Sequence, residues 1–281
     1  MDRKALPYLM LAPATLFLCV FFLYPFVLVA VQAFSGDAGF TLEHFQTMFG
    51  HWKFPTTFGN TMLLAATVVP IQLIMALGMA SVVTKIDRGK DIVLYILTIP
   101  LGISDLAAGI IWLSIFDQSG FLNSILSGFG LIEHPVMFLG YQNKGMIFLA
   151  VVLAEIWRAT AIMLVILVAG MSMIPKEYYE AAEVFGASPW QRFIRVTLPM
   201  LRPSLQTALI LRTILAFEVF AVVAALAGTN FPVLMGEVYT WQFDLQDTHV
   251  AAAMALVILA ISVGFTLFFL RTLRVPREAQ L

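Results

Sequence analysis

The sequence predicts an all-α membrane protein with six transmembrane helices, and three observations lead to this fold class. First, 60% of the 281 residues are apolar and only 12% are charged, whereas soluble domains have roughly 45–50% apolar and about 25% charged residues. Second, the mean hydropathy of +0.92 shows that the chain lacks the polar residues needed to cover a water-facing surface. Third, six apolar stretches each reach the length of about 20 residues that a membrane-spanning helix needs.

Composition also excludes other classes of protein. A single Cys excludes a disulfide framework. The formal net charge of −1 argues against a nucleic-acid-binding protein, which needs a basic patch. Transmembrane β-strands alternate in polarity over about 10 residues, and runs such as Ala150–Ala154 show no alternation. The apolar stretches are therefore predicted to be helices.

The six helices are expected within one transmembrane domain that comprises residues 1–281. The first follows Arg3 and Lys4, and its apolar run exceeds the roughly 7–15 residues of a signal-peptide core. Pro25 is tolerated within it if neighbouring groups satisfy the carbonyl that it leaves free. The predicted spans lie at about 8–34, 58–84, 92–116, 146–172, 204–228 and 249–271.

Basic residues predict the orientation of these spans. Most of the 16 Lys and Arg residues fall in segments on one side of the membrane, and the opposite loops hold only Lys53 and Lys144. By the positive-inside rule the basic side is cytoplasmic, so both termini are expected in the cytoplasm. The basic-side residues are Arg3, Lys4, Lys85, Arg88, Lys90, Lys176, Arg192, Arg195, Arg202, Arg271, Arg274 and Arg277.

One cytoplasmic segment, residues 173–203, is much longer than the others. Its pattern predicts two short helices at an angle. Pro175 suits the first position of the first helix, and Gly186 ends that helix. Ser188 suits the N-cap of the second helix, with Pro189 at its first position.

The same segment carries an apolar stripe with small residues at its centre. Pro199 and Pro203 are expected to end the second helix and lead into the fifth span. The stripe suits either docking into the groove of a partner protein or a position on the lipid headgroups, and the spacing alone favours neither. The stripe consists of Tyr178, Ala181, Ala182 and Phe185.

A longer motif in this segment resembles a known family. Glu180-Ala181-Ala182, then Gly186-Ala187, Phe193 and Val196-Thr197-Leu198-Pro199 are similar to the "EAA" loop of the permeases of ABC importers. The resemblance implies a type I ABC-importer permease fold, in which this loop forms coupling helices that sit in a groove of an ATP-hydrolysing subunit. It therefore favours docking over a position on the lipid. The implied coupling residues are Tyr178, Glu180, Ala181, Ala182, Phe185, Gly186 and Ala187.

Over nearly its whole length the chain is similar to carbohydrate permeases such as the first permease subunit of the maltose transporter. It rests on runs such as Leu6-Pro7-Tyr8, Ile156-Trp157-Arg158 and Leu211-Arg212-Thr213-Ile214. Two positions depart from the usual pattern: Val184-Phe185 replaces Ile-Asp, and Gly228–Pro232 replaces a Gly-Gly-Gly-Pro run. The resemblance implies a multi-pass protein of the prokaryotic inner membrane. The implied partners are a second permease subunit, two ATPase subunits, an extracytoplasmic substrate-binding protein and membrane lipid, but no nucleic acid.

The sequence lacks the motifs that hydrolysis of ATP or metal binding would need. The phosphate-binding pattern G-x-x-x-x-G-K-[ST] does not occur, because Gly89-Lys90 is followed by Asp91. ATP and Mg²⁺ are therefore expected on partner subunits, and no cofactor on this chain. None of the four His is paired at i, i+4, and no metal site is expected.

Charged residues at membrane depth face protein or a cavity, so some of them, together with nearby aromatic and polar residues, are candidates for the solute path. Glu155 and Arg158 are expected to pair on one helix, and Arg212 either pairs across helices or extends towards the cytoplasm. Glu218, flanked by aromatic residues, suits either hydrogen bonds to sugar hydroxyls with a ring stacked on the sugar face or an ion pair with an Arg of this chain or of a second permease subunit. The substrate-path candidates are Asp105, Trp112, Trp157, Glu218 and Asn230.

Together these features predict the transmembrane permease of an ATP-driven importer that translocates a sugar by alternating access. A permease of the same superfamily for another small polar solute is the first alternative. An ion-gradient-driven secondary transporter is the second, although no clear inverted repeat links the two halves. A membrane-embedded enzyme is disfavoured, because no paired carboxylates, Ser/Lys dyad or His cluster lie at one depth.

Overall fold

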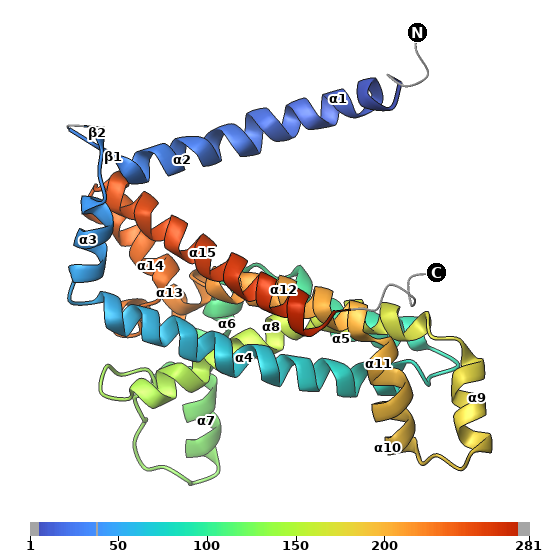
Figure 1. Ribbon diagram of the computed structural model, residues 1–281. Helices are drawn as coiled ribbons and strands as arrows, with labels where there is room; N and C mark the ends of the chain where they lie inside the picture. Colours follow the sequence, from blue (N-terminus) through green and yellow to red (C-terminus); the bar gives the residue numbers. More distant parts are fainter. Residues whose placement is uncertain (1–5, 38, 275–281) are drawn as a thin grey trace. The chain divides into compact units, whose positions relative to one another are not determined.

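The computed structural model describes residues 6–37 and 39–274, which form two compact units (Figure 1). The first unit comprises the described residues up to Pro55 together with Met235–Ala260, and the second comprises Thr56–Leu234 and the described residues from Ile261 onward. Arg3, Lys4 and Arg277, which contributed to the predicted orientation, lie outside the described residues.

The first unit contains the first predicted span as a continuous helical stretch, Met10–Phe34. No residue in the most apolar part of this helix is buried against the rest of the chain. A π-helical turn precedes Pro25 and accommodates the proline without ending the helix. The elements of this unit are α1 (Leu6–Leu18), η1 (Cys19–Leu23), α2 (Tyr24–Phe34), β1 (Ser35–Gly36), β2 (Gly39–Phe40), α3 (Glu43–Gly50), α14 (Leu234–Tyr239) and η5 (Thr240–Asp244).

Polar contacts tie the end of α2 to the start of α15 (Thr248–Thr272). The Gln32 side chain donates to the Thr248 hydroxyl over 3.1 Å, and His249 Nδ1 lies 2.8 Å from the Gln32 carbonyl oxygen. Beside them, Met48 and Trp241 are buried in a small apolar cluster. This unit is thus held together around the first residues of α15.

The second unit is built around α8. Of the residues in the most apolar part of α8, 67% are buried, compared with 33% in α4. Its core packs α8 against α4, α6 and α13, through residues such as Leu64, Ala108, Val151 and Val222. The elements are α4 (Phe54–Val83), α5 (Lys90–Thr98), η2 (Ile99–Gly102), α6 (Asp105–Phe116), α7 (Phe121–Gly128), α8 (Lys144–Ser172), α9 (Lys176–Val184), α10 (Pro189–Arg192), η3 (Phe193–Thr197), α11 (Leu198–Met200), α12 (Arg202–Phe217), α13 (Ala221–Ala227) and η4 (Gly228–Asn230).

Two predicted spans, those at 92–116 and 204–228, are bent, a feature that was not predicted. In the first, the helices before and after Ile103 meet at 93°, because Pro100 lies in the last turn and the Ser104 side chain caps a new helix by accepting from the Ala107 N–H over 3.2 Å. In the second, the axis turns by 48° at Glu218–Phe220. Four continuous helices and these two bent pairs account for the six predicted spans.

Small residues bring helices of the second unit into close contact. A Cβ placed on Gly109 of α6 would lie 2.6 Å from Ala225 Cβ and 3.2 Å from Val222 Cα of α13. A Cβ on Gly170 of α8 would collide with Ser204 of α12. Glycines at helix contacts let backbones approach closely, as is typical of helices packed within membranes.

Candidate functional site

Residues 173–203, here called the coupling segment, fold as two short helices separated by a sharp turn. The first helix, α9, ends in two hydrogen bonds typical of a glycine C-cap: Ala187 N–H to Ala182 O at 2.9 Å and Gly186 N–H to Glu183 O at 2.8 Å. Gly186 has φ +76°, a left-handed conformation that residues with a Cβ seldom adopt. The predicted stop at Gly186 is confirmed.

The second helix begins as the sequence predicts, with a capping box at Ser188. The Ser188 hydroxyl accepts from Gln191 N–H at 3.3 Å, the Gln191 side chain accepts from Ser188 N–H at 2.9 Å, and Pro189 follows at the first position.

Pro175 is the N-cap of α9 rather than its first residue, so that prediction is wrong by one position. The second helix runs through α10, η3 and α11 and ends at Met200, between Pro199 and Pro203. The fifth predicted span then begins as α12 at Arg202, as predicted.

The predicted coupling residues place an apolar surface in solvent. Phe185 and Tyr178 are 89% and 53% exposed, Glu180 and Ala181 are exposed as well, and Ala182 and Ala187 are half-buried. Val184, which the sequence analysis did not include, is 85% exposed beside them. Its apolar side chain directly before Phe185 could have identified it in the sequence as part of the same exposed surface. Large apolar side chains grouped in solvent on one short helix mark a surface for contact with another protein.

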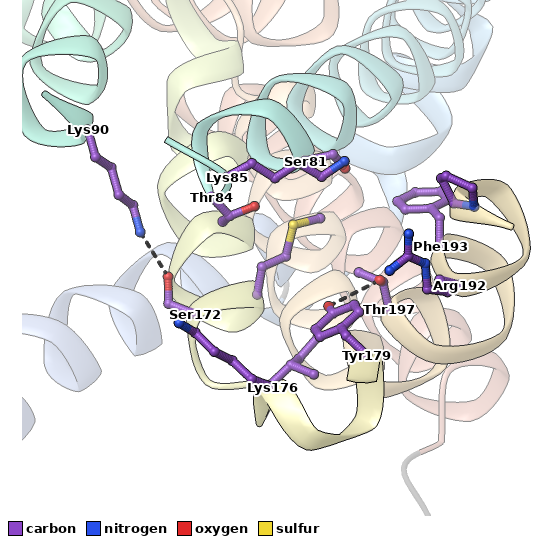
Figure 2. A pocket seen from close by; sticks show the side chains of 13 residues that line it. Ser81, Thr84, Lys85, Lys90, Ser172, Lys176, Tyr179, Arg192, Phe193 and Thr197 are labelled. Carbon is purple, nitrogen blue, oxygen red and sulfur yellow. Dashed lines mark hydrogen bonds between the residues drawn. The ribbon is translucent and has the colours of Figure 1, made fainter. Parts of the chain in front are cut away.

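The opposite side of the coupling segment faces a cavity of about 510 Å³ (Figure 2). Tyr179 Oη and Thr197 Oγ1 lie 3.1 Å apart and link α9 to η3 across the turn, and Arg192 forms an ion pair with Glu183. The turn is therefore held by side chains from both helices, so the segment has a defined internal geometry.

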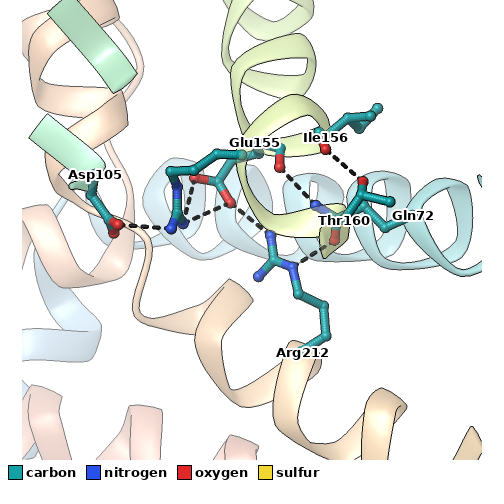
Figure 3. Close-up of polar contacts among 7 residues, drawn as sticks. Gln72, Asp105, Glu155, Ile156, Thr160 and Arg212 are labelled. Carbon is teal, nitrogen blue, oxygen red and sulfur yellow. Dashed lines mark hydrogen bonds and ion pairs between the residues drawn. The ribbon is translucent and has the colours of Figure 1, made fainter. Parts of the chain in front are cut away.

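A network of ion pairs and hydrogen bonds joins four helices in the second unit (Figure 3). Arg212 of α12 donates to Glu155 of α8 over 2.6 Å and to the side-chain oxygen of Gln72 of α4 over 2.5 Å. Arg158 lies 3.2 Å from the other oxygen of Glu155 and 2.8 Å from Asp105 of α6. Gln72 also donates to the Glu155 carbonyl oxygen over 2.7 Å.

Burial makes this network costly to disrupt. The Arg212 and Glu155 side chains are fully buried, and Asp105 at the edge is 47% exposed. Two guanidinium groups balance two carboxylates, which satisfies the rule that buried charges are paired. Arg212 Nη1 and Arg158 Nε are buried without a hydrogen-bond partner.

The network decides between two sequence-based alternatives. Arg212 pairs across helices instead of extending towards the membrane surface, and the expected Glu155–Arg158 pair is present. Sequence reasoning missed Gln72. The signal was present, since Gln72 is a polar amide within the apolar run of the second predicted span, and its side chain is fully buried.

Three of the five substrate-path candidates take part in two separate contacts between α6 and α8. Asp105 contacts Arg158, and the rings of Trp112 and Trp157 meet edge-on at 6.3 Å. Glu218 is exposed at the bend between α12 and α13, whereas Asn230 is exposed at the end of η4, beyond α13. Among residues 6–37 and 39–274 no group of His, Cys, Asp or Glu could hold a metal ion.

Curated proteins with similar sequences are transport permeases. The chain is 28% identical over 284 residues to the sn-glycerol-3-phosphate transport system permease protein of Yersinia pestis bv. Antiqua, covering 95% of this chain and 93% of the relative. It is 31% identical to the sulfoquinovosyl glycerol transport system permease protein of Agrobacterium fabrum, covering 96% of this chain and 91% of the relative.

A solved structure shares the fold. A chain of a bacterial alginate ABC transporter, crystallised in complex with an alginate pentasaccharide-bound periplasmic protein, matches with a TM-score of 0.83 and 24% identity, covering 97% of this chain and 95% of that chain. The type I ABC-importer permease fold expected from the coupling motif is thus confirmed.

The family of binding-protein-dependent transport system inner membrane components matches residues 72–279. The match includes the coupling segment and every charged member of the network. Because it spans most of the sequence, this chain belongs to that family and is a permease component of a binding-protein-dependent import system.

Proposed function

We propose that the chain imports a carbohydrate by alternating access and that the coupling segment transmits ATP-driven motion to the membrane helices. The observation that carries this proposal is the exposed apolar surface of Tyr178, Val184 and Phe185 on a short helix with a fixed turn. A helix that presents such a surface fits a groove on a partner. The sequence holds no phosphate-binding loop, so the partner that hydrolyses ATP is a separate subunit.

Contacts within the second unit support a route for this motion. The coupling segment runs through η3 and α11 directly into α12. Arg212 on α12 is bonded to Glu155 of α8 and Gln72 of α4, and Arg158 extends the chain of pairs to Asp105 of α6. Rigid elements joined by buried pairs move together. We infer that α4, α6, α8 and α12 follow the coupling segment as one body.

The transport cycle then has two steps. ATP binding closes the two nucleotide-binding subunits, whose grooves carry the coupling segments of this chain and of a second permease subunit, and the transmembrane cavity opens outward. A substrate-binding protein docked on the outer loops releases its ligand into that cavity, and hydrolysis reverses the motion. In this proposal the chain binds no cofactor itself, and both of its termini lie in the cytoplasm.

A carbohydrate is the substrate class that several observations support. One relative is a permease of a sulfoquinovosyl glycerol transport system, and a structural neighbour was crystallised in complex with an alginate pentasaccharide-bound periplasmic protein. Trp112 and Trp157 offer rings, and Asp105 offers a partly exposed carboxylate, as sugar recognition requires. The glycerol-3-phosphate relative favours a second candidate, a small polyol phosphate.

Replacement of Phe185 by Asp tests the docking surface. We expect the full chain with Phe185→Asp to insert into membranes normally but to co-purify with far less ATPase subunit, because a charge replaces an apolar contact. Phe243→Asp is the matched control, since Phe243 is also exposed, at 61%, but lies outside the coupling segment. Equal recovery of the ATPase subunit with all three chains would contradict the proposal.

A further inference from the structure

The cavity behind the coupling segment has a cationic wall that the proposed transport cycle does not use. Lys85, Lys90, Lys176 and Arg192 all line it, and no carboxylate is among its lining residues (Figure 2). These four side chains come from the end of α4, the start of α5, α9 and α10. Two distant parts of the sequence, residues 81–90 and 171–197, therefore converge on one concave basic surface.

Most of this positive charge is uncompensated within the chain. Among the described residues, no carboxylate lies within ion-pair distance of Lys85, Lys90 or Lys176. Of the four cations, only Arg192 has a carboxylate partner, Glu183, whose side chain is 58% exposed, whereas Lys90 donates a hydrogen bond to the Ser172 hydroxyl over 3.3 Å. Cations held around a concavity attract an anion more strongly than the same charges spread over a flat surface.

The remaining lining residues suit a phosphate group attached to an apolar body. The hydroxyls of Tyr179 and Thr197 lie 3.1 Å apart and share one hydrogen bond, so one hydroxyl hydrogen is available to an anion. Met171, Ile174 and Phe193 supply an apolar wall beside the cations. The volume of about 510 Å³ falls within the roughly 300–1,000 Å³ typical of small-molecule sites.

We propose that this cavity binds a phosphate group, supplied by the headgroup of an anionic phospholipid. Basic pockets between membrane helices at the cytoplasmic surface bind such headgroups, and the apolar wall favours a lipid over free phosphate. The phosphate would bridge α9 and α10 to the segment between α4 and α5. Its occupancy would thereby fix the inner side of the coupling segment while the outer side contacts the ATPase subunit.

That the cavity lies on the cytoplasmic side of the membrane rests on the orientation proposed above. The ability of its cations to bind a phosphate group does not depend on that orientation. The test therefore measures binding rather than transport. The full chain, purified with its partner subunits, is incubated with phosphatidylglycerol or with phosphatidylcholine, and retained lipid is counted by native mass spectrometry. Radiolabelled inorganic phosphate in equilibrium dialysis forms a separate arm.

A double variant and a matched control make the result specific. Lys85→Gln/Lys176→Gln removes two wall cations, whereas Arg88→Gln/Arg195→Gln removes the same charge from exposed residues of the same two segments that do not line the cavity. We expect retention of phosphatidylglycerol to fall on the order of tenfold or more in the first variant and to stay unchanged in the control.

The outcomes separate the two sources of phosphate. Selective loss of phosphatidylglycerol identifies a lipid headgroup, and binding of inorganic phosphate that the first variant alone loses identifies a soluble phosphate at the same site. Equal loss in both double variants, or no binding of either probe by the unmodified chain, would overturn the proposal. Failure of sugar uptake with lipid binding intact would contradict the proposed function and leave this site standing.

Discussion

Arg212 and Glu155 form a fully buried ion pair that joins α12 to α8, with 2.6 Å between Arg212 Nη2 and Glu155 Oε2. Gln72 contacts both partners, accepting from Arg212 Nε and donating to the Glu155 carbonyl oxygen. Breaking a buried pair by removing one partner leaves an uncompensated charge, which is far more costly than replacing both.

We expect Arg212→Met to destabilise the chain by about 3 kcal/mol or more, because it leaves the buried Glu155 carboxylate with only Arg158. Arg212→Met/Glu155→Gln is expected to be less damaging than Arg212→Met alone. The midpoint of thermal unfolding in detergent measures both effects. Arg202→Gln, at the exposed start of α12, is the control. A single variant as stable as this control would contradict the structural role of the pair.

Gly109→Ala tests the close contact between α6 and α13. The new Cβ would lie 2.6 Å from Ala225 Cβ, so the helices must separate, and overpacking of this kind costs about 1–3 kcal/mol. Gly145→Ala is matched to it, since a Cβ there meets nothing within 4 Å. A lower unfolding midpoint is expected for Gly109→Ala only, and the same midpoint for both variants would refute the contact.

Glu218→Gln tests a candidate of the solute path. Glu218 is exposed where α12 bends into α13, and losing a charged hydrogen bond costs about 1.5–3 kcal/mol. We expect KM for uptake of the transported sugar to rise roughly tenfold or more, with an unchanged unfolding midpoint. Glu133→Gln, on an exposed loop, serves as the control. Unchanged uptake by Glu218→Gln would remove this residue from the path.

Local features of the coupling segment could be predicted because they depend on neighbouring residues. The stop at Gly186 and the cap at Ser188 each follow from turn chemistry within a few positions. The apolar stripe at Tyr178 and Phe185 followed from helical spacing, and both residues are exposed.

The intramembrane network and the bends could not be predicted in the same way. Gln72 and Arg212 are 140 positions apart, and only the packing of α4, α8 and α12 brings them together. Hydropathy reports the length of an apolar run but not its axis, so the 93° bend after Pro100 was missed although that proline and Ser104 are visible in the sequence. Where the helices of one unit lie against each other is set by contacts distant in sequence.

The geometry of the turn at Gly186 is the central element of the proposed coupling. Gly186 has φ +76°, which Asn tolerates and a β-branched residue does not. Gly186→Val should therefore displace the surface of α9, and Gly186→Asn should preserve it. Glu180→Lys, which reverses a charge on the exposed surface, is expected to act like Gly186→Val.

The most direct test is the ATPase activity of the reconstituted transporter, measured with and without its loaded substrate-binding protein. We expect the stimulation by the binding protein to be lost in Gly186→Val and Glu180→Lys and retained in Gly186→Asn, with equal amounts of each chain in the membrane. Full stimulation together with normal sugar uptake in both Gly186→Val and Glu180→Lys would contradict the role of the coupling segment.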